Sequence, residues 1–383
     1  MKENSLNSKL PKKVIHIIIG LNIGGAELML YRLIKNSLKN GQYNHEVITL
    51  TGLGIVGSRL RKLGVLVTCL NMKSSLQTPA VFFRLFRILY RNKKSIIQTW
   101  MYHADFLGGL AAFVSGNRKI VWNIRGSSIP QEGFSLTGSL VKVCTVLSFF
   151  VPKKIVCCSE VSKTSHIDLG YAKKKIIVIT NGYDLHNYNT NTNANTIKHN
   201  LGIKDNEIVI GIIGRLDPLK DYQNFMFAAR ELIKKYSNIK LIMIGRGIEY
   251  NNKDFMELIG CNFDLTNFLL LGERRDVNQY LGIMDIYCMS SLSEGFPNTV
   301  CEAMAMKIPC VVTDAGDAKN IVSDTGITVP IKDHLALSSA LKVMISLGPE
   351  KRKLLGDSAR NRIKEKYSIC NILKEYESIY NEL

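Results

Sequence analysis

A short glycine-rich segment near the start of the chain has the composition of a phosphate-binding turn. Residues 20–27 read GLNIGGAE and lie between an apolar run and a helical pattern. Glycine lets the backbone come close to a ligand, and the helix amides that follow Gly24 and Gly25 would donate hydrogen bonds to a phosphate. The alternative is a tight strand-to-helix turn that needs glycine for its geometry alone.

Two cations occupy the corresponding place in the second half of the chain. Residues 212–221 read IIGRLDPLKD, and Arg215 and Lys220 follow the apolar run across a short loop. Two positive charges there could neutralise the diphosphate of a leaving group. A pair of surface cations that make ordinary ion pairs is the alternative.

The third group contains two glutamates around a loop. Residues 293–304 read SEGFPNTVCEAM, with Glu294 before a Gly-Phe-Pro loop and Glu302 in the helix that follows. Asn298 or Thr299 is expected to cap that helix. The spacing does not place both carboxylates on one helix face, so they could hold different parts of one ligand while the helix amides hold its phosphates. The alternative is a capped helix with an acid favoured by the helix dipole.

Each of these groups follows or adjoins an apolar run that predicts a strand, and helical patterns lie between the runs. Regular alternation predicts parallel sheets covered on both faces, and ligands bind at the carboxyl ends of such strands. We expect an α/β protein of two Rossmann-like, doubly wound domains that face each other across a cleft. The expected strands are residues 14–19, 46–50, 65–70, 95–99, 119–124, 154–158, 176–180, 208–214, 239–245, 268–272, 285–289 and 309–313.

A low-complexity polar stretch divides the chain. Residues 187–200 read NYNTNTNANTIKHN, a composition typical of a linker. We therefore expect an N-terminal domain over residues 11–185, a linker over 186–200, and a C-terminal domain over 201–365. The last segment, 366–383, is expected to be a helix that packs back on the N-terminal domain. A chain of 383 residues is long enough for two cores.

The positive charge is confined to the first half. The formal net charge is +18; residues 1–185 carry 26 Lys and Arg against 8 Asp and Glu, whereas residues 186–383 carry 24 of each. Residues 134–151 are nearly all apolar but shorter than a membrane span of about 20 residues, so a buried or interfacial helix is expected. Basic clusters beside such a helix favour attraction to an anionic membrane surface. A solvated basic face without a partner is the alternative.

The cysteines and the N-terminus favour a cytoplasmic protein. The nine cysteines form no Cys-x-x-Cys pair and no cluster with histidine, so reduced thiols are expected. The first thirteen residues, MKENSLNSKLPKK, lack the apolar core of a signal peptide. Together with the basic half, these features predict a peripheral protein on the inner face of the membrane.

Taken in order, the motifs resemble the family 4 glycosyltransferases, retaining enzymes of the two-domain GT-B type. The similarity covers residues 14–373 and is nearest to the bacterial subgroup that builds O-antigen (lipopolysaccharide) and capsule polysaccharide. It implies transfer of a hexose or N-acetylhexosamine from a nucleotide diphosphate, with UDP expected first and GDP second, to a glycan acceptor that is expected to be lipid-linked. The matching segments are GGAE, TWMYHADFLGGLAA, NIRGS, VITNGYD, IGRLDPLKD, LLLGERRDV and SSLSEGFPNTVCEAMAMKIPCVVTDAGDAKNIV.

The resemblance implies catalytic roles for four residues. His103 would contact the donor sugar near the reacting centre, and Glu294 would bind the transferred sugar. Arg215 and Lys220 would hold the diphosphate.

It also implies a donor and acceptor site around them. Glu302 would bind the ribose hydroxyls, and Gly24 and Gly25 would lie against the donor phosphates and the acceptor. Arg125 and Glu27 are expected to help bind phosphate or acceptor. The remaining donor contacts would come from Gly295, Phe296, Asn298, Thr299 and Val300, chiefly through backbone amides.

The sequence contains no Asp-x-Asp motif and no carboxylate cluster suited to a divalent ion, so we expect neither a metal nor a cofactor. Two other functions compete with this interpretation. A nucleotide-sugar epimerase could use the same two-domain scaffold. A nucleic-acid-binding module would suit the basic half, but the sequence lacks a helix-turn-helix, an aromatic stacking motif and a zinc site, so no nucleic-acid partner is expected.

Overall fold

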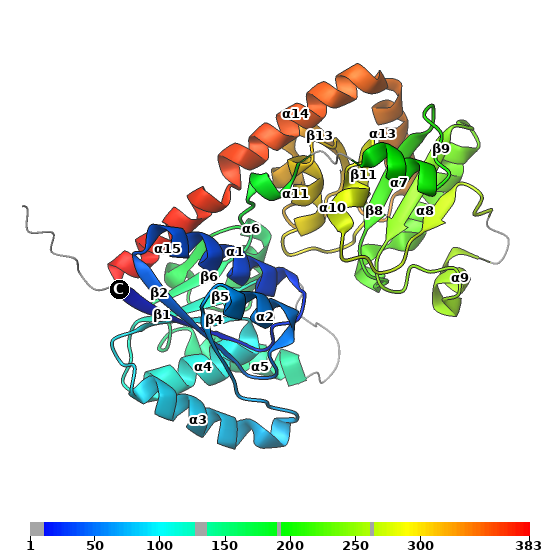
Figure 1. Ribbon diagram of the computed structural model, residues 1–383. Helices are drawn as coiled ribbons and strands as arrows, with labels where there is room; N and C mark the ends of the chain where they lie inside the picture. The colour runs from blue at the N-terminus through cyan, green and yellow to red at the C-terminus, as the bar shows by residue number, and fades with distance from the viewer. Residues whose placement is uncertain (1–10, 127–135, 190–192, 261–263) are drawn as a thin grey trace, which may run out of the picture. The chain divides into compact units, whose positions relative to one another are not determined.

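The computed structural model describes residues 11–126, 136–189, 193–260 and 264–383, and the chain forms two compact units. Unit 1 consists of Met1–Gly182 and Ile369–Leu383, and unit 2 of Tyr183–Ser368 (Figure 1). The chain therefore passes between the units twice. The two passages are joined, because the amide of Tyr183 donates to the carbonyl of Tyr367 at 2.8 Å.

Unit 1 contains a seven-stranded parallel sheet in the order β3-β2-β1-β4-β5-β6-β7. The order reverses between β1 and β4, which makes the switch point where ligands bind in doubly wound sheets. Its strands are β1 (Lys12–Ile18), β2 (Tyr43–Thr49), β3 (Leu66–Cys69), β4 (Ile96–Trp100), β5 (Ile120–Ile124), β6 (Lys154–Cys157) and β7 (Ile176–Val178). Its helices are α1 (Gly25–Asn40), α2 (Gly54–Lys62), η1 (Ser75–Gln77), α3 (Thr78–Tyr90), α4 (Tyr102–Val114), α5 (Leu136–Leu147), α6 (Glu160–Asp168), η2 (Lys173–Lys175) and α15 (Ile369–Glu382).

Unit 2 repeats this topology with a six-stranded parallel sheet in the order β10-β9-β8-β11-β12-β13. Its switch point lies between β8 and β11. The strands are β8 (Ile208–Ile213), β9 (Ile239–Ile244), β10 (Phe268–Leu270), β11 (Ile286–Met289), β12 (Cys310–Thr313) and β13 (Gly326–Val329). The helices are η3 (Leu185–Asn187), α7 (Ala194–Asn200), η4 (Pro218–Lys220), α8 (Tyr222–Ile233), α9 (Lys253–Ile259), α10 (Val277–Leu281), α11 (Asn298–Ala305), α12 (Ala318–Val322), η5 (Ser323–Thr325), α13 (His334–Ser346) and α14 (Gly348–Lys366).

Helices cover both faces of the unit 1 sheet, as the alternating strands predict. Along β1, Val14 and Ile18 pack into a core with α1, α2 and α15, whereas Ile15 and Ile17 pack into a second core with α3, α4 and α5. Side chains alternate across a strand, so a strand that is apolar throughout must be covered on both sides. The three helices α3, α4 and α5 therefore form one layer (Figure 1).

All twelve strands expected from the apolar runs are present; their ends lie within two residues of the expected ones, except that β2 begins three residues earlier. The sequence analysis missed β13 at the sheet edge. Only Val329 of its four residues is buried, because an edge strand needs less apolar surface, and so no apolar run marks it.

Two other expectations need correction. The segment 186–200 is not wholly a linker, because its last seven residues form α7 and its first two belong to η3. The units change at Gly182 and again at Ile369, a few residues from the predicted boundaries, and α15 packs into the unit 1 core.

The apolar segment 134–151 forms a shorter helix than expected. Helix α5 ends at Leu147, and Val151 is buried against unit 1, while residues 134 and 135 lie outside the described part of the chain. In the described ranges, no helix is both long enough and apolar enough to cross a bilayer. The described cysteines are free thiols, and six of the eight are buried.

Candidate active site

The unit 2 switch point brings together two of the predicted residues. The loop after β8 carries Lys220, and the loop after β11 carries Glu294. The Lys220 Nζ lies 2.5 Å from Glu294 Oε1, and the Ser291 hydroxyl donates to the same oxygen at 2.7 Å. Because both side chains are mostly buried, this ion pair is less screened by water than a surface pair.

Hydrogen bonds to backbone carbonyls join these two loops. The amide of Leu292 donates to the carbonyl of Leu219 at 2.8 Å, and the hydroxyl of Ser290 donates to the carbonyl of Lys220 at 2.8 Å. The hydroxyl of Thr313, at the end of β12, donates to the carbonyl of Ser291 at 2.6 Å. These hydrogen bonds therefore fix the backbone of the loop that carries Lys220 against the loop that carries Glu294.

A glycine that the sequence analysis did not single out makes the glutamate loop possible. Gly316 has a φ of +60°, and a Cβ there would lie 2.2 Å from the carbonyl oxygen of Glu294. Only glycine combines that backbone angle with that close approach. Ser291 was also missed, because nothing in a lone serine marks it as a partner of Glu294.

Arg215 lies in the same loop as Lys220 but does not reach Glu294. Its Nε and Nη2 donate to one oxygen of Asp217 at 3.0 and 2.7 Å, and its side chain is 61% exposed. Burial alone would raise the pKa of Asp217. Hydrogen bonds from the Leu219 amide and from Arg215, together with the charge of Lys220, lower it by more, so the pKa of Asp217 lies below its usual value. Each predicted cation is thus paired with a carboxylate.

Helix α11 begins differently from the sequence expectation. Asn298 is its first residue and Pro297 its N-cap, and the cap residue supplies no side-chain hydrogen bond. Neither Asn298 nor Thr299 caps the helix, because tyrosines hold both side chains: Asn298 Oδ1 accepts from the Tyr183 hydroxyl at 2.6 Å, and Thr299 Oγ1 accepts from the Tyr287 hydroxyl at 2.7 Å.

Tyrosines near the passages between the units contact three predicted donor-site residues. Besides the Tyr183–Asn298 bond, the Tyr188 hydroxyl donates to Glu302 Oε1 at 3.4 Å. The ring of Tyr367 meets the ring of Phe296 edge to face, with centroids 5.8 Å apart. The side chains of Phe296 and Val300 are buried, so these two residues can offer a ligand only their backbone groups.

The unit 1 switch point holds the glycine turn. Gly24 is the N-cap of α1 in an extended conformation, and a Cβ there would lie 2.3 Å from a carboxylate oxygen of Glu27. Burial raises the pKa of Glu27, which a hydrogen bond to its own backbone partly offsets. The carboxylate of Glu27 therefore faces the glycine turn, and Gly25 follows as the first helical residue.

The turn after β4 presents His103 at the same switch point. Met101, the N-cap of helix α4, has a φ of +70°, an unusual angle for a residue with a side chain. The fully buried Asp105 accepts a hydrogen bond from Thr99 at 2.5 Å, and burial raises its pKa well above the usual value. Burial also lowers the pKa of His103, whose ring makes no hydrogen bond within the part of the chain that the structure describes.

Arg125 is held by unit 1 itself. Its Nη1 donates to Asn181 Oδ1 at 3.0 Å and to the carbonyl of Ile179 at 3.2 Å, and its Nη2 donates to the hydroxyl of Tyr376 in α15. These contacts give it a structural role in holding α15 on the sheet, which the sequence did not indicate.

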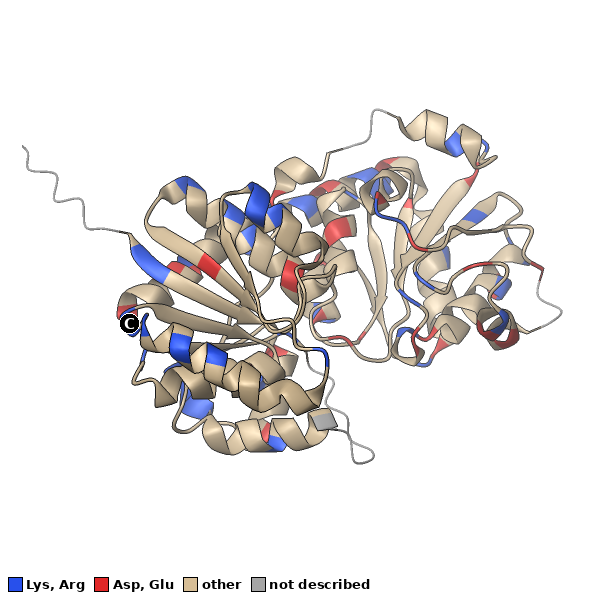
Figure 2. Cartoon of the chain, turned by 60° about the horizontal axis from the view of Figure 1, so that its bottom comes forward, with Lys and Arg blue, Asp and Glu red and all other residues tan. Residues whose placement is uncertain are grey.

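Among the described residues, no group of three or more His, Cys, Asp or Glu side chains could hold a metal ion. In the described loops after β8 and β11, the positive side chains are those of Arg215 and Lys220. Figure 2 shows the Lys and Arg residues of the chain in blue and the Asp and Glu residues in red.

Comparison with known protein families assigns both halves of the chain. The family model described as Glycosyltransferase Family 4 matches residues 23–187, and the model described as Glycosyl transferases group 1 matches residues 207–346. The first range contains the Gly24–Gly25 turn and His103, and the second contains Lys220 and Glu294.

The most informative relatives are bacterial. The chain is 24% identical to the UDP-Gal:alpha-D-GlcNAc-diphosphoundecaprenol alpha-1,3-galactosyltransferase of Escherichia coli, over 85% of this chain and 84% of that protein. It is also 24% identical to the capsular polysaccharide biosynthesis glycosyltransferase CapM of Staphylococcus aureus, over 78% of this chain and 79% of CapM. The fold is similar to that of Anabaena HepE in complex with UDP, with a TM-score of 0.84, 20% identity, and coverage of 97% of this chain and 100% of HepE.

Proposed function

Because the chain belongs to the glycosyltransferases, with a family 4 domain followed by a group 1 domain, we propose that it transfers a sugar from UDP, with retention at the anomeric carbon, to a lipid-linked glycan in cell-surface polysaccharide synthesis. The printed names of its relatives support the donor and the acceptor: one uses a UDP-sugar and a diphosphoundecaprenol acceptor, and another acts in capsule synthesis.

The observation that carries the proposal is the Lys220–Glu294 pair at the unit 2 switch point. An ammonium there can accept the negative charge that develops on a leaving diphosphate, and a carboxylate beside it can accept hydrogen bonds from sugar hydroxyls. The first-turn amides of α11 would add donors for the phosphates. Glu302, four residues further along α11, would bind the ribose.

In the proposed reaction, the bond between the anomeric carbon and the diphosphate oxygen breaks, and the acceptor oxygen attacks from the same face. The proton of the acceptor hydroxyl passes to the leaving diphosphate, so no side chain is required as a general base. Lys220 and Arg215 would neutralise the leaving group in place of a metal ion. His103 and the Gly24–Gly25 turn would contribute contacts to the donor sugar and the acceptor from unit 1.

The charge of unit 1 supports a position at the membrane. A glycan on a lipid carrier lies at a bilayer surface, and the enzyme must reach it there. We propose peripheral association with the inner, anionic leaflet, which is the side where nucleotide sugars are available to a protein of the cytoplasm.

A thermal-shift panel tests the donor assignment. UDP-, GDP-, ADP- and dTDP-sugars are added in turn, with and without EDTA, to the wild-type chain and to Lys220→Ala. We expect a rise in the melting temperature with one UDP-sugar, insensitive to EDTA and absent in Lys220→Ala. Stabilisation that disappears with EDTA would contradict metal independence, and selective stabilisation by another nucleotide would replace UDP as the donor.

His103→Ala separates the two halves of the proposal. Because His103 lies in unit 1, the variant should still be stabilised by the donor but should transfer the sugar more slowly, by about 10²-fold. The anomeric configuration of the wild-type product, measured by NMR coupling constants, tests retention directly. A β-linked product from an α-linked donor would contradict it.

A further inference from the structure

Helix α3 carries two adjacent stripes of side chains away from its buried face. Val81, Leu85 and Leu89 point into the core of unit 1. The first outer stripe is aromatic, at positions Phe83, Phe86 and Tyr90, and the second is basic, at positions Arg84, Arg87 and Arg91. Both stripes follow the spacing of one helix face.

The aromatic stripe is continuous and largely exposed. The ring centroids of Phe83 and Phe86 are 6.3 Å apart, and those of Phe86 and Tyr90 are 5.8 Å apart. Phe83 is 62% exposed and Tyr90 54% exposed, and Leu76 in the preceding turn is 90% exposed. Neighbouring large apolar side chains that remain this exposed indicate a surface that contacts something apolar.

The surrounding charge has one sign. Between Glu46 and Asp105 the chain has no acidic residue, and it contains nine cations, namely Arg59, Arg61, Lys62, Lys73, Arg84, Arg87, Arg91, Lys93 and Lys94. The last five lie on α3 or in the turn that follows it. A protein partner with mixed charges would need acids opposite these cations at fixed positions, whereas an anionic bilayer presents negative charge over its whole area.

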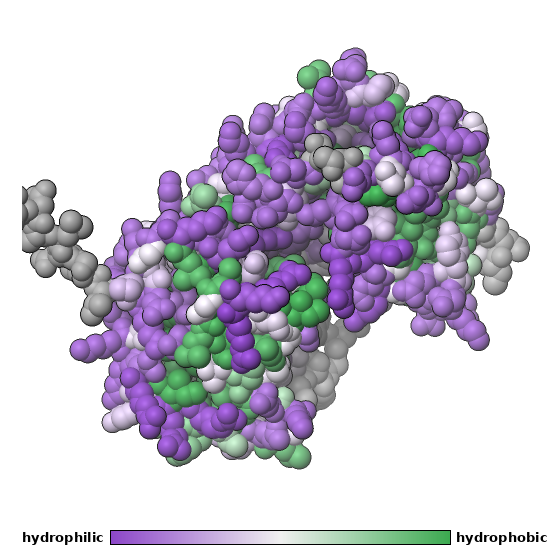
Figure 3. All heavy atoms as spheres, in the orientation of Figure 1, coloured by the Kyte–Doolittle hydropathy of each residue, from purple (hydrophilic) through white to green (hydrophobic). Residues whose placement is uncertain are grey.

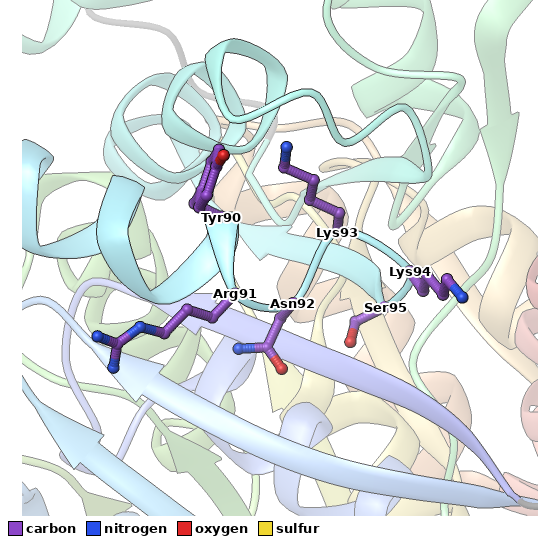
Figure 4. Close-up of a pocket in the computed structure, with 6 residues that line it drawn as sticks. All are labelled: Tyr90, Arg91, Asn92, Lys93, Lys94 and Ser95. Carbon is purple, nitrogen blue, oxygen red and sulfur yellow. The ribbon is translucent and has the colours of Figure 1, made fainter.

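The cationic side chains of the turn between α3 and β4 point in different directions and do not meet at one point. Residues Tyr90–Ser95 line a shallow cavity of about 350 Å³. Figure 4 shows Tyr90 and Lys93 pointing to one side of the turn, while Arg91 and Lys94 point in other directions. The Lys93 Nζ lies 3.9 Å from the centre of the Tyr90 ring. This arrangement does not enclose a single anion, but it suits many headgroups on a surface.

Helix α5 adds apolar surface to the same layer. It packs beside α4, as α3 does on the other side of α4, and all three cover one face of the sheet. Val143, Val146, Phe149 and Phe150 are exposed on or just after α5. Figure 3 shows hydrophobic residues exposed among hydrophilic ones over unit 1. The apolar segment noted in the sequence is thus one part of a wider surface.

We propose that the outer face of α3, with its aromatic and arginine stripes, is the surface by which this protein lies on an anionic lipid bilayer. The aromatic rings insert at the level of the headgroups, and the arginines bind the lipid phosphates around them. At 13 residues, α3 is too short to span the bilayer and lies along it. Its N-terminal end is near the carboxyl edge of the sheet, the edge that carries the glycine turn and His103. The purpose of this surface, which is to reach a lipid-linked acceptor, rests on the proposed function, whereas the physical argument for membrane binding does not.

Vesicle flotation tests the proposal. The full chain is mixed with phosphatidylcholine vesicles that contain or lack phosphatidylglycerol. The aromatic variant is Phe83→Ser with Tyr90→Ser, and the basic variant is Arg87→Gln with Arg91→Gln. Arg84 is left unchanged because its guanidinium donates to the carbonyl of Leu70 and so supports the fold. We expect the wild-type chain to float only with the anionic vesicles.

Either double variant should weaken binding to the anionic vesicles by about tenfold or more, because each charge or ring at the interface adds to the free energy of binding. Matched controls lie in unit 2. Leu335→Ser with Leu354→Ser removes side chains that are 60% and 67% exposed, and Lys351→Gln with Lys353→Gln removes two exposed charges of α14. Both controls should float like the wild-type chain.

Three outcomes would overturn the proposal: α3 variants that float like the wild-type chain, wild-type flotation that does not depend on phosphatidylglycerol, or a dimer in light scattering that the Phe83→Ser, Tyr90→Ser variant dissociates. Salt-sensitive binding to RNA that the Arg87→Gln, Arg91→Gln variant abolishes, without flotation, would also overturn it. Donor binding by thermal shift is measured on the same samples. A chain that binds the donor but does not float refutes this surface alone, whereas one that floats but binds no nucleotide sugar refutes the proposed function alone.

Discussion

The two units share one topology but differ in what they expose. Both sheets are parallel, and both reverse their strand order after the first strand, between β1 and β4 in unit 1 and between β8 and β11 in unit 2. Unit 1 carries 27 Lys and Arg against 10 Asp and Glu, whereas unit 2 carries 23 against 22. The difference shows that the fold supplies the position of a site, while the residues placed there and on the surface supply its chemistry.

The two switch points also share a position in the fold but differ in the residues that occupy them. In unit 2 the two loops meet through the Lys220–Glu294 ion pair and two further hydrogen bonds. In unit 1 the loops present His103 and the Gly24–Gly25 turn without an equivalent ion pair among the described residues. The loops of unit 2 are therefore held together by direct contacts, whereas no ion pair holds the loops of unit 1 within the described residues.

The largest effect should come from the ion pair of unit 2. Lys220→Ala removes the cation proposed to neutralise the leaving group, so turnover should fall by about 10²-fold or more. Lys234→Ala serves as the matched control, because Lys234 pairs with Glu231 on the exposed surface of the same unit. Wild-type turnover in Lys220→Ala would mean that unit 2 does not hold the diphosphate in this way.

As the pH falls from 6.5 towards 4, we expect unit 1 to lose stability at a higher pH than unit 2. The Trp100 Nε1 donates to His16 Nδ1 at 3.3 Å, so His16 Nε2 carries a hydrogen and donates to His45 Nδ1 at 3.0 Å. His45 Nε2 then donates to the hydroxyl of Ser37 at 2.8 Å. This chain requires both rings to be neutral. Burial lowers the pKa of His45 to about 4, and burial together with the charge of His45 lowers the pKa of His16.

A histidine whose pKa is depressed in the folded state stabilises the protein fully above its unfolded pKa of 6.5, and this contribution is lost as the pH falls towards about 4. The loss should be on the order of 3 kcal/mol. Both tryptophans, Trp100 and Trp122, lie in unit 1, so their fluorescence during urea unfolding reports this unit. Unit 2 has no buried histidine among its described residues. A pH-independent tryptophan transition between pH 6.5 and 4, or an unchanged pH dependence in His45→Gln, would contradict this account.

The tyrosines near the passages between the units should have a smaller effect. Tyr183→Phe removes the hydrogen bond to Asn298 Oδ1, and one such bond is worth about 1 kcal/mol, so KM for the donor should rise by about fivefold with little change in kcat. Tyr250→Phe is the control, because its hydroxyl also donates to a carbonyl of unit 2, that of Phe268. A fall in kcat without a change in KM would assign Tyr183 another role.

The smallest effect concerns Arg215. Asp217→Asn keeps an oxygen that can accept from the Leu219 amide but weakens the hold on the guanidinium, which is then available to a phosphate. Exposed ion pairs of this kind contribute about 0–1 kcal/mol, so donor affinity measured by calorimetry should rise by roughly two- to fourfold at most. Weaker binding in the variant would mean that the Asp217–Arg215 pair orients the guanidinium for the ligand.

The sequence alone determined the repeating architecture and the placement of the chemistry. The burial of each strand or helix shows in the apolar pattern of its own residues. Twelve strands could therefore be predicted, together with the loops that carry Lys220, Glu294 and His103.

Only the tertiary structure decided which distant residues meet. Lys220 and Glu294 are 74 positions apart, and they touch because β8 and β11 are neighbours in the sheet. Arg125 is held by Tyr376 because α15 returns to unit 1, and Asn298 is held by Tyr183 and does not cap its helix. The strand β13 and the exposed stripes of α3 depend likewise on which faces their neighbours cover. Periodicity is a property of neighbouring residues, whereas these contacts depend on sheet order and on the path of the chain between units, which no local pattern encodes.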